Sequence, residues 1–101
     1  MYPIALHLQG KKCIVFGAGK VAQRRVWGLL ESGAEVTVAA PEPMPACWKS
    51  TKLTYLQQPY APELLGENLL VFAATDDSAE NARIVREAQA AGKLASSATV
   101  S

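Results

Sequence analysis

Short apolar runs recur along the chain, separated by stretches in which apolar residues have helical spacing. The runs are only four to seven residues long and rich in Val, Ile, Leu and Ala, so each predicts a β-strand buried on at least one face. Residues 69–74 are the most continuous run, as expected for a central parallel strand. The predicted strands are residues 13–16, 35–40, 53–56, 69–74 and 94–100.

Two longer stretches have apolar residues three and four positions apart, which predicts amphipathic helices. The first lies between the first two predicted strands, ends at Gly33, and carries a stripe made of Ala22, Val26, Leu29 and Leu30. The second lies between the last two predicted strands and carries on one face Asn81, Ile84, Val85, Ala88 and Ala91. Asp77 or Ser78 can cap its start, and Glu80 would complete a capping box with Asp77.

The order of these elements predicts an α/β fold. Strands alternate with helices or short helical links, and connections between parallel strands are right-handed. We therefore expect a Rossmann-like doubly wound parallel sheet of about five strands, in the order 3-2-1-4-5, with a ligand crevice between strands one and four. The chain, residues 1–101, is expected to form a single domain. Small residues at 94–100 would leave one sheet edge bare, which predicts association with another subunit as a homo-oligomer.

A glycine loop joins the first predicted strand to the first predicted helix. It reads Gly17-Ala18-Gly19 and is followed by Ala22, the GxGxxA pattern of a dinucleotide site. Gly17 permits a tight turn, Gly19 lets backbone amides approach a pyrophosphate, and Ala22 keeps the helix close to the sheet. The alternative interpretation of this loop is a structural turn that binds no ligand. The strand, loop and helix context favours a nucleotide cradle.

Further candidate ligand contacts follow the second and fourth predicted strands. Pro41 and Glu42 come after residues 35–40, so either Glu42 accepts hydrogen bonds from ribose hydroxyls or backbone groups hold the ribose. No arginine stands nearby to select a 2′-phosphate, which favours NAD over NADP. Thr75 and Asp76 end the central strand beside the glycine loop, where open α/β sheets place their ligands.

Composition narrows the possible partners. A net charge of +1 argues against a nucleic-acid or membrane-surface protein, because phosphate affinity needs accumulated basic charge. No stretch is long and apolar enough to predict a membrane helix. Cys13 and Cys47 have no His or Cys partner at metal-ligand spacing, so we expect no metal site and reduced thiols in a cytoplasmic protein.

The chain resembles the NAD-binding domain of the siroheme synthase family over nearly its whole length. The resemblance rests on residues 17–25 (GAGKVAQRR), 31–38 (ESGAEVTV) and 73–77 (AATDD) together with Asn81. It implies an NAD-dependent precorrin-2 dehydrogenase, an oxidoreductase of siroheme and porphyrin biosynthesis that converts the tetrapyrrole precorrin-2 to sirohydrochlorin; some members also insert iron. By position it implies NAD contacts from Lys20, Val21, Pro41, Glu42, Thr75 and Asp76.

Two departures from the family pattern bear on catalysis. Family members carry, after the fifth strand, an aspartate regarded as the acid/base, and this chain has Thr99 at about that place. A hydroxyl cannot replace a carboxylate in proton transfer near neutral pH, so no catalytic residue is assigned. The family's dimerisation and substrate-binding region is also not seen in these residues. We therefore expect either a precorrin-2 dehydrogenase, or its isolated cofactor-binding domain, or a non-catalytic NAD-binding module that regulates or assembles with a tetrapyrrole enzyme.

Overall fold

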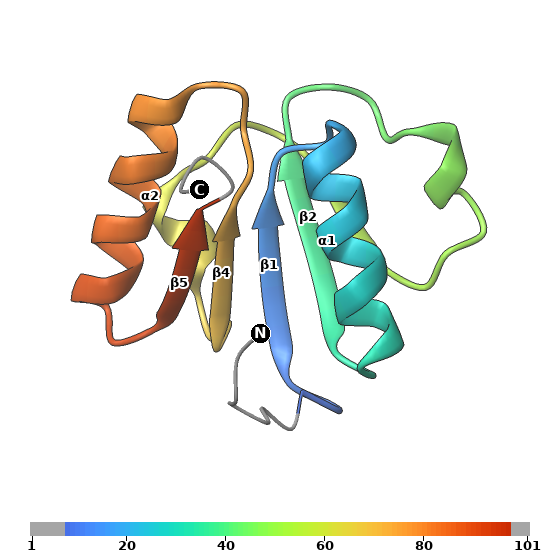
Figure 1. Ribbon diagram of the computed structural model, residues 1–101, viewed down its shortest axis with the longest axis horizontal. Helices are drawn as coiled ribbons and strands as arrows, with labels where there is room; N and C mark the ends of the chain where they lie inside the picture. Colours follow the sequence, from blue (N-terminus) through green and yellow to red (C-terminus); the bar gives the residue numbers. More distant parts are fainter. Residues whose placement is uncertain (1–7, 98–101) are drawn as a thin grey trace.

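A five-stranded parallel sheet forms the centre of the computed structural model, which describes residues 8–97 (Figure 1). Its strand order, β3-β2-β1-β4-β5, is the predicted order 3-2-1-4-5. The predicted Rossmann-like α/β fold is therefore confirmed. The strands are β1 (Lys12–Phe16), β2 (Glu35–Ala40), β3 (Thr54–Gln57), β4 (Leu70–Ala73) and β5 (Leu94–Ser97).

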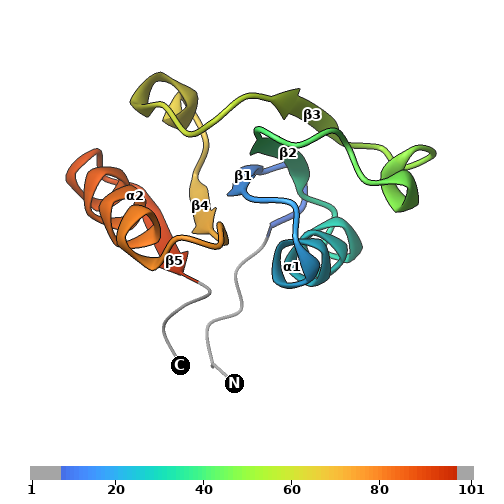
Figure 2. The ribbon, with the colours of Figure 1, turned by 90° about the horizontal axis from the view of Figure 1, so that it is seen from above.

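The helices cover the two faces of this sheet. Seen from above, α1 (Lys20–Glu31) and α2 (Ser78–Ala90) lie on opposite sides of it (Figure 2). Two short 3-10 helices complete the connections: η1 (Ala46–Trp48) between β2 and β3, and η2 (Pro62–Leu65) between β3 and β4. This is the doubly wound arrangement, in which the strand order runs outward from β1 to β3 on one side and from β4 to β5 on the other, with a crevice between β1 and β4.

Strand β1 lies at the centre of the core because its neighbours bury both of its faces. Cys13 and Val15 belong to the apolar cluster under α1, whereas Ile14 and Phe16 belong to the cluster under α2 and η2. All four are at most 1% exposed. Full burial of a side chain of this size contributes about 1.5–3 kcal/mol, so β1 anchors the loop that follows it.

Three strands differ from the prediction by one residue at their ends, and β1 begins at Lys12 and not at residue 13. Strand β3 begins at Thr54 and not at residue 53, and β4 is shorter than residues 69–74. The ladder nevertheless continues past β4, since Leu69 N donates to Lys12 O (2.8 Å) and Ala74 N donates to Phe16 O (2.8 Å). The end of the predicted last strand and Thr99 lie outside the described residues.

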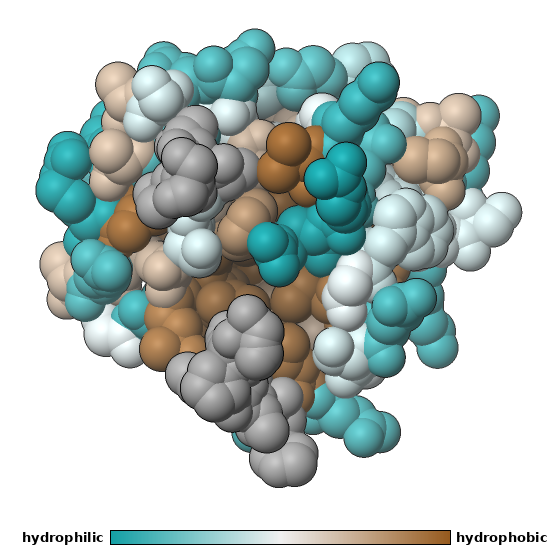
Figure 3. All heavy atoms as spheres, in the orientation of Figure 1, coloured by the Kyte–Doolittle hydropathy of each residue, from teal (hydrophilic) through white to brown (hydrophobic). Residues whose placement is uncertain are grey.

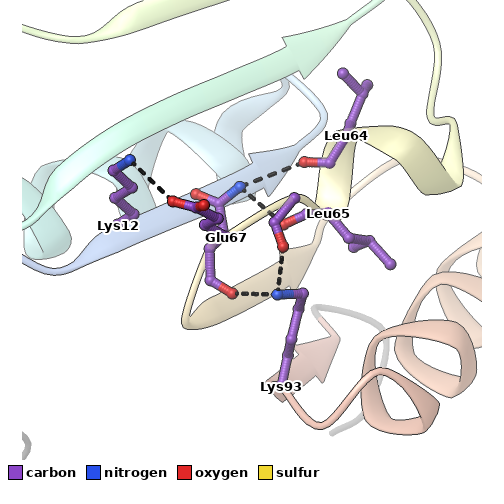
Figure 4. Close-up of polar contacts among 7 residues, drawn as sticks. Lys12, Leu64, Leu65, Glu67 and Lys93 are labelled. Atoms are coloured by element: carbon purple, nitrogen blue, oxygen red, sulfur yellow. Dashed lines mark hydrogen bonds and ion pairs between the residues drawn. The ribbon is translucent and has the colours of Figure 1, made fainter.

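Lys93 forms hydrogen bonds to the connection between η2 and β4, at the amino ends of the strands. Lys93 Nζ donates to the carbonyl oxygens of Gly66 (2.7 Å) and Asn68 (2.9 Å), and Asn68 Nδ2 donates back to η2 (Figure 4). Lys12 and Glu67 form an exposed ion pair beside it, with 3.6 Å between Nζ and Oε1. These contacts stabilise the end of the sheet that is opposite the candidate site.

The face of the sheet beside α1 carries apolar surface. Figure 3 shows brown side chains gathered over the strands, next to the polar side chains of α1. Leu94 of β5 is 46% exposed and pairs in register with Leu70. Within residues 8–97, no helix combines the length and apolarity needed to cross a membrane.

Candidate functional site

A cavity of about 660 Å³ opens at the carboxyl ends of the strands. Segments after four strands line it: the glycine loop after β1, the proline-rich loop after β2, Pro59 and Tyr60 after β3, and the turn after β4. The structure brings together every site residue predicted from the sequence. Its lining includes Gly17, Gly19, Lys20, Val21, Pro41, Glu42, Thr75 and Asp76.

Gly17 is required by the close approach of the turn after β4. Its φ angle is +119°, and a Cβ atom placed on it would lie 2.2 Å from Ala74 O. Its own N–H donates to Ala39 O of β2 at 2.9 Å. Only glycine fits such a junction, because both the backbone angle and the space exclude a side chain. The tight turn predicted at Gly17 is therefore present.

Gly19 faces open space at the start of α1. Its φ angle is −77°, and no heavy atom lies within 4 Å of the position of a Cβ. The first helical hydrogen bond runs from Gln23 N to Gly19 O (2.9 Å), so the amides of the first turn lie outside the ladder. Within the described residues no side chain caps this end and no acidic residue occupies its first turn. The positive end of the helix dipole is thus free for an anion.

The amino end of α2 is closed in contrast to that of α1. Asp77 Oδ1 accepts hydrogen bonds from Ala79 N (3.0 Å) and Glu80 N (3.2 Å), which confirms the predicted cap. The reciprocal half of the predicted capping box is wrong, because Asp77 N donates to Thr75 Oγ1 (3.2 Å). Glu80 is one of the residues that line the cavity. Of the two long helices, α1 is therefore the one that can bind a phosphate at its amino end.

A buried asparagine holds the turn after β4. Asn81 is 0% exposed; its Oδ1 accepts from Thr75 N (3.0 Å) and Thr75 Oγ1 (2.7 Å), and its Nδ2 donates to Thr75 O (3.0 Å). The Thr75 hydroxyl is thus engaged within the turn, whereas Asp76 is exposed at the cavity. The sequence pattern placed Asn81 on the packed helix face without a role. A polar residue among apolar ones on that face was the signal for it.

The opposite wall of the cavity is the loop after β2. It includes Pro41, Glu42, Pro43 and Pro45. Tyr55 of β3 donates its hydroxyl hydrogen to Glu42 O at 2.7 Å. The loop is thereby attached to the sheet at the residue that carries the carboxylate.

Tyr60 forms part of the cavity lining, a role that sequence reasoning did not assign. Its ring meets Phe16 edge-to-face at 4.9 Å between centroids, its hydroxyl donates to Glu87 Oε1, and Arg83 lies over the ring at 5.3 Å. Burial, followed by the hydrogen bond to Glu87, raises the pKa of Tyr60 well above the ordinary tyrosine value. The phenol is therefore a neutral donor at physiological pH.

Comparison with known proteins places this chain in a family. The family model described as "Putative NAD(P)-binding" matches residues 4–101. The chain belongs to this family. It is 41% identical over 91 residues to the siroheme synthase of Methylobacillus flagellatus, covering 87% of the chain and 20% of that protein. It is 40% identical over 94 residues to the siroheme synthase of Nitrosospira multiformis, with 86% and 20% covered. The resemblance to the siroheme synthase NAD-binding domain is confirmed.

A solved structure extends the likeness to the whole fold. SirC, a precorrin-2 dehydrogenase, superposes with a TM-score of 0.83 at 30% identity, over 100% of the chain and 51% of SirC. The chain thus spans about half the length of SirC and a fifth of the siroheme synthases. The predicted cofactor, NAD, agrees with the family and with this neighbour.

The charges around the cavity suit the NAD(P)-binding family. Lys20 is the cation among the described lining residues and stands at the free amino end of α1. A pyrophosphate at this place would be attracted both by the Lys20 ammonium group and by the positive end of the helix dipole. Carboxylates line the two flanks: Glu42 on one side, Asp76 and Glu80 on the other. Within residues 8–97 no group of three or more His, Cys, Asp or Glu side chains could hold a metal ion. Cys13 is buried and Cys47 exposed, and both are free thiols.

Proposed function

We propose that this chain is the NAD-binding part of a precorrin-2 dehydrogenase. The observation that supports this most strongly is the match to SirC over the whole chain, with the glycine-loop cavity at the carboxyl ends of β1 and β4. NAD accepts hydride from the tetrapyrrole in such an oxidation, and the protein binds and orients the two molecules. Since the chain spans only part of its relatives, the remaining substrate contacts come from sequence or subunits outside these residues.

Each wall of the cavity has a role in this proposal. The amides of the first turn of α1, at Lys20 and Val21, bind the pyrophosphate that Gly19 allows to approach. Pro41 and Glu42 lie at the adenosine side, with the Glu42 carboxylate accepting from ribose hydroxyls. The turn at Thr75 and Asp76, held by Asn81, supports the nicotinamide side.

Titration of the purified chain with NAD tests the cofactor site. A Gly19→Val variant should fold like the wild type, because its side chain meets open space, but should lose NAD affinity, because that space is where the pyrophosphate enters. Gly28→Ala, on α1 and also free of neighbours within 4 Å, is the matched control and should bind NAD as the wild type does. Unchanged NAD affinity in Gly19→Val would refute the assignment of this loop.

A turnover assay distinguishes the second candidate, a non-catalytic NAD-binding module. Thr99 at the place of the family's aspartate favours that candidate. Mixing the chain with precorrin-2 and NAD should produce the absorbance of sirohydrochlorin if the chain is itself an active dehydrogenase. NAD binding without turnover assigns the chain to the binding module, or to a cofactor domain that needs its remaining parts.

The proposal also includes the location, domain organisation and association of the protein. We place it in the cytoplasm as a single domain over residues 1–101, supported by its free thiols and its relatives among bacterial siroheme synthases. Association through the half-exposed strand β5 is part of the proposal, because β5 is the last strand in the sheet order of the described residues and an edge strand can extend its ladder in another subunit. Sedimentation of the concentrated chain as a strict monomer would contradict that part.

A further inference from the structure

The carboxylate-bearing loop after β2 is restrained more closely than an ordinary surface loop. Glu42 stands between Pro41 and Pro43, so both of its neighbours have a fixed φ angle, and the following proline confines the Glu42 backbone to extended conformations. The remaining freedom of the loop is limited by the hydrogen bond from Tyr55 Oη to Glu42 O, at 2.7 Å. This bond joins the loop directly to β3.

Tyr55 is itself held by the core. It pairs in register with Val38 of β2, and its ring lies against Trp48, with 6.1 Å between centroids and a 50° tilt. Trp48 is 0% exposed. Burial, and next the Glu42 carboxylate, raise the pKa of Tyr55 above its ordinary value, so the phenol keeps its hydrogen at neutral pH. The donor is therefore a fixed, protonated group on a rigid element.

A second connection attaches the far end of the same loop to the glycine loop. Cys47 Sγ donates to Gln23 Oε1 at 3.7 Å, and Gln23 Nε2 donates to Ala18 O at 2.8 Å. The loop is thus tied to β3 at Glu42 and to the glycine loop through α1. The position of the Glu42 backbone relative to the pyrophosphate site is set by these two links.

We propose that Tyr55 is a positioning residue for cofactor selectivity, which favours NAD over NADP by holding Glu42 at the adenosine ribose. This inference rests on the proposed function of the cavity. The hydrogen bond holds the Glu42 backbone, and a carboxylate that extends from this backbone accepts hydrogen bonds from the two ribose hydroxyls of NAD and repels the 2′-phosphate of NADP. Among the lining residues within 8–97, Lys20 is the only cation and lies at the pyrophosphate end, so no side chain of that set offsets the repulsion. A loosened loop would let the carboxylate swing away, which weakens NAD binding and relieves the repulsion.

The test compares dissociation constants for NAD and NADP in the wild-type chain, Tyr55→Phe, Glu42→Gln and the double variant. Tyr55→Phe keeps the ring on Trp48 and removes only the hydroxyl, so the preference for NAD should fall about fivefold, the effect of one neutral hydrogen bond. Glu42→Gln should abolish most of the preference. In the Glu42→Gln background, Tyr55→Phe should change the ratio less than twofold, because Tyr55 acts through the carboxylate.

Ser32→Ala is the matched control. It also removes one hydroxyl that donates to a backbone carbonyl, Gly28 O at 3.1 Å, but at the end of α1 remote from the cavity, and it should leave the NAD/NADP ratio unchanged. A wild-type chain that binds no NAD would refute the proposed function and the inference with it. A wild-type chain that prefers NAD, with the same ratio in Tyr55→Phe, would refute the inference alone. An equal loss of selectivity from Tyr55→Phe with and without Glu42 would also overturn it.

Discussion

Replacing Gly17 by alanine should destabilise the fold more than any other glycine-to-alanine change in the glycine loop. The new Cβ would lie 2.2 Å from Ala74 O and 3.1 Å from Thr75 N. These are backbone atoms at the end of β4, where Ala74 N donates to Phe16 O at 2.8 Å. The turn cannot retreat without breaking that bond, and it cannot shift sideways without disturbing the turn that Asn81 holds.

Two costs add at this position. An alanine at a φ angle of +119° is strained by about 1–3 kcal/mol. Forcing a methyl group against packed backbone costs about 1–3 kcal/mol more. The sum of about 2–6 kcal/mol is a large part of the 5–15 kcal/mol that stabilises a domain of roughly this size. At about 4–8 °C per kcal/mol, the melting temperature should fall by at least about 8 °C.

Thermal unfolding followed by circular dichroism measures this effect, with Gly19→Ala as the control. Gly19 has a negative φ angle and no neighbour within 4 Å of the new methyl group, so the loss there should stay below about 1 kcal/mol, the preference of glycine over alanine at a helix N-cap. A Gly17→Ala variant that melts within about 4 °C of the wild type would show that the turn after β4 is not held against Gly17.

Three further outcomes are expected. Asn81→Ala should lower the free energy of unfolding in urea by about 2–4 kcal/mol, since it leaves buried backbone groups unpaired; a loss below about 1 kcal/mol would contradict this role. Because burial and Glu87 raise the pKa of Tyr60, the folded chain holds the phenol proton of Tyr60 more tightly than the unfolded chain does. The contribution of this group to the free energy of unfolding should be full below about pH 10, the ordinary tyrosine pKa, and should fall above it. Tyr60→Phe should make this fall in stability with pH less steep. An equally steep fall in the variant would count against Tyr60 as its origin. In the native chain iodoacetamide should modify Cys47 and spare buried Cys13, whereas in urea both thiols should react. Intact-mass spectrometry counts the alkylated cysteines. Rapid labelling of Cys13 in the native chain would mean that β1 opens easily.

The architecture could be predicted from the sequence because its signals are local. Apolar runs specify strands, helical spacing specifies α1 and α2, and the rule of right-handed connections orders them. The same rules brought the glycine loop and the turn at Thr75 and Asp76 to one crevice, since carboxyl ends of neighbouring parallel strands meet there. The glycine loop, Thr75 and Asp76 thus followed from topology, the resemblance added Lys20 and Val21, and Tyr60 was not predicted.

The partners of those residues could not be predicted, because they depend on side chains that meet only after folding. Nothing in the spacing shows that Asn81 would take up the Thr75 hydroxyl and leave Asp77 without the reciprocal bond from Glu80. The path of the proline-rich loop also lacks periodicity, so the hydrogen bond from Tyr55 to the Glu42 carbonyl has no signature in the sequence. Hydrophobic patterning determines where the chain goes, whereas long-range polar contacts decide how firmly each loop is held.

The burial of Trp48 gives the protein a built-in optical probe. Trp48 is 0% exposed and contacts the Tyr55 ring, whereas Trp27 on the outer side of α1 is 42% exposed. A soluble quencher such as acrylamide will therefore quench the fluorescence of Trp27 first and leave the fluorescence of buried Trp48, which lies at shorter wavelength. With Trp27 replaced by phenylalanine, the remaining signal would report on the wall that carries Glu42. Loosening of that wall can then be followed in real time, without any attached label.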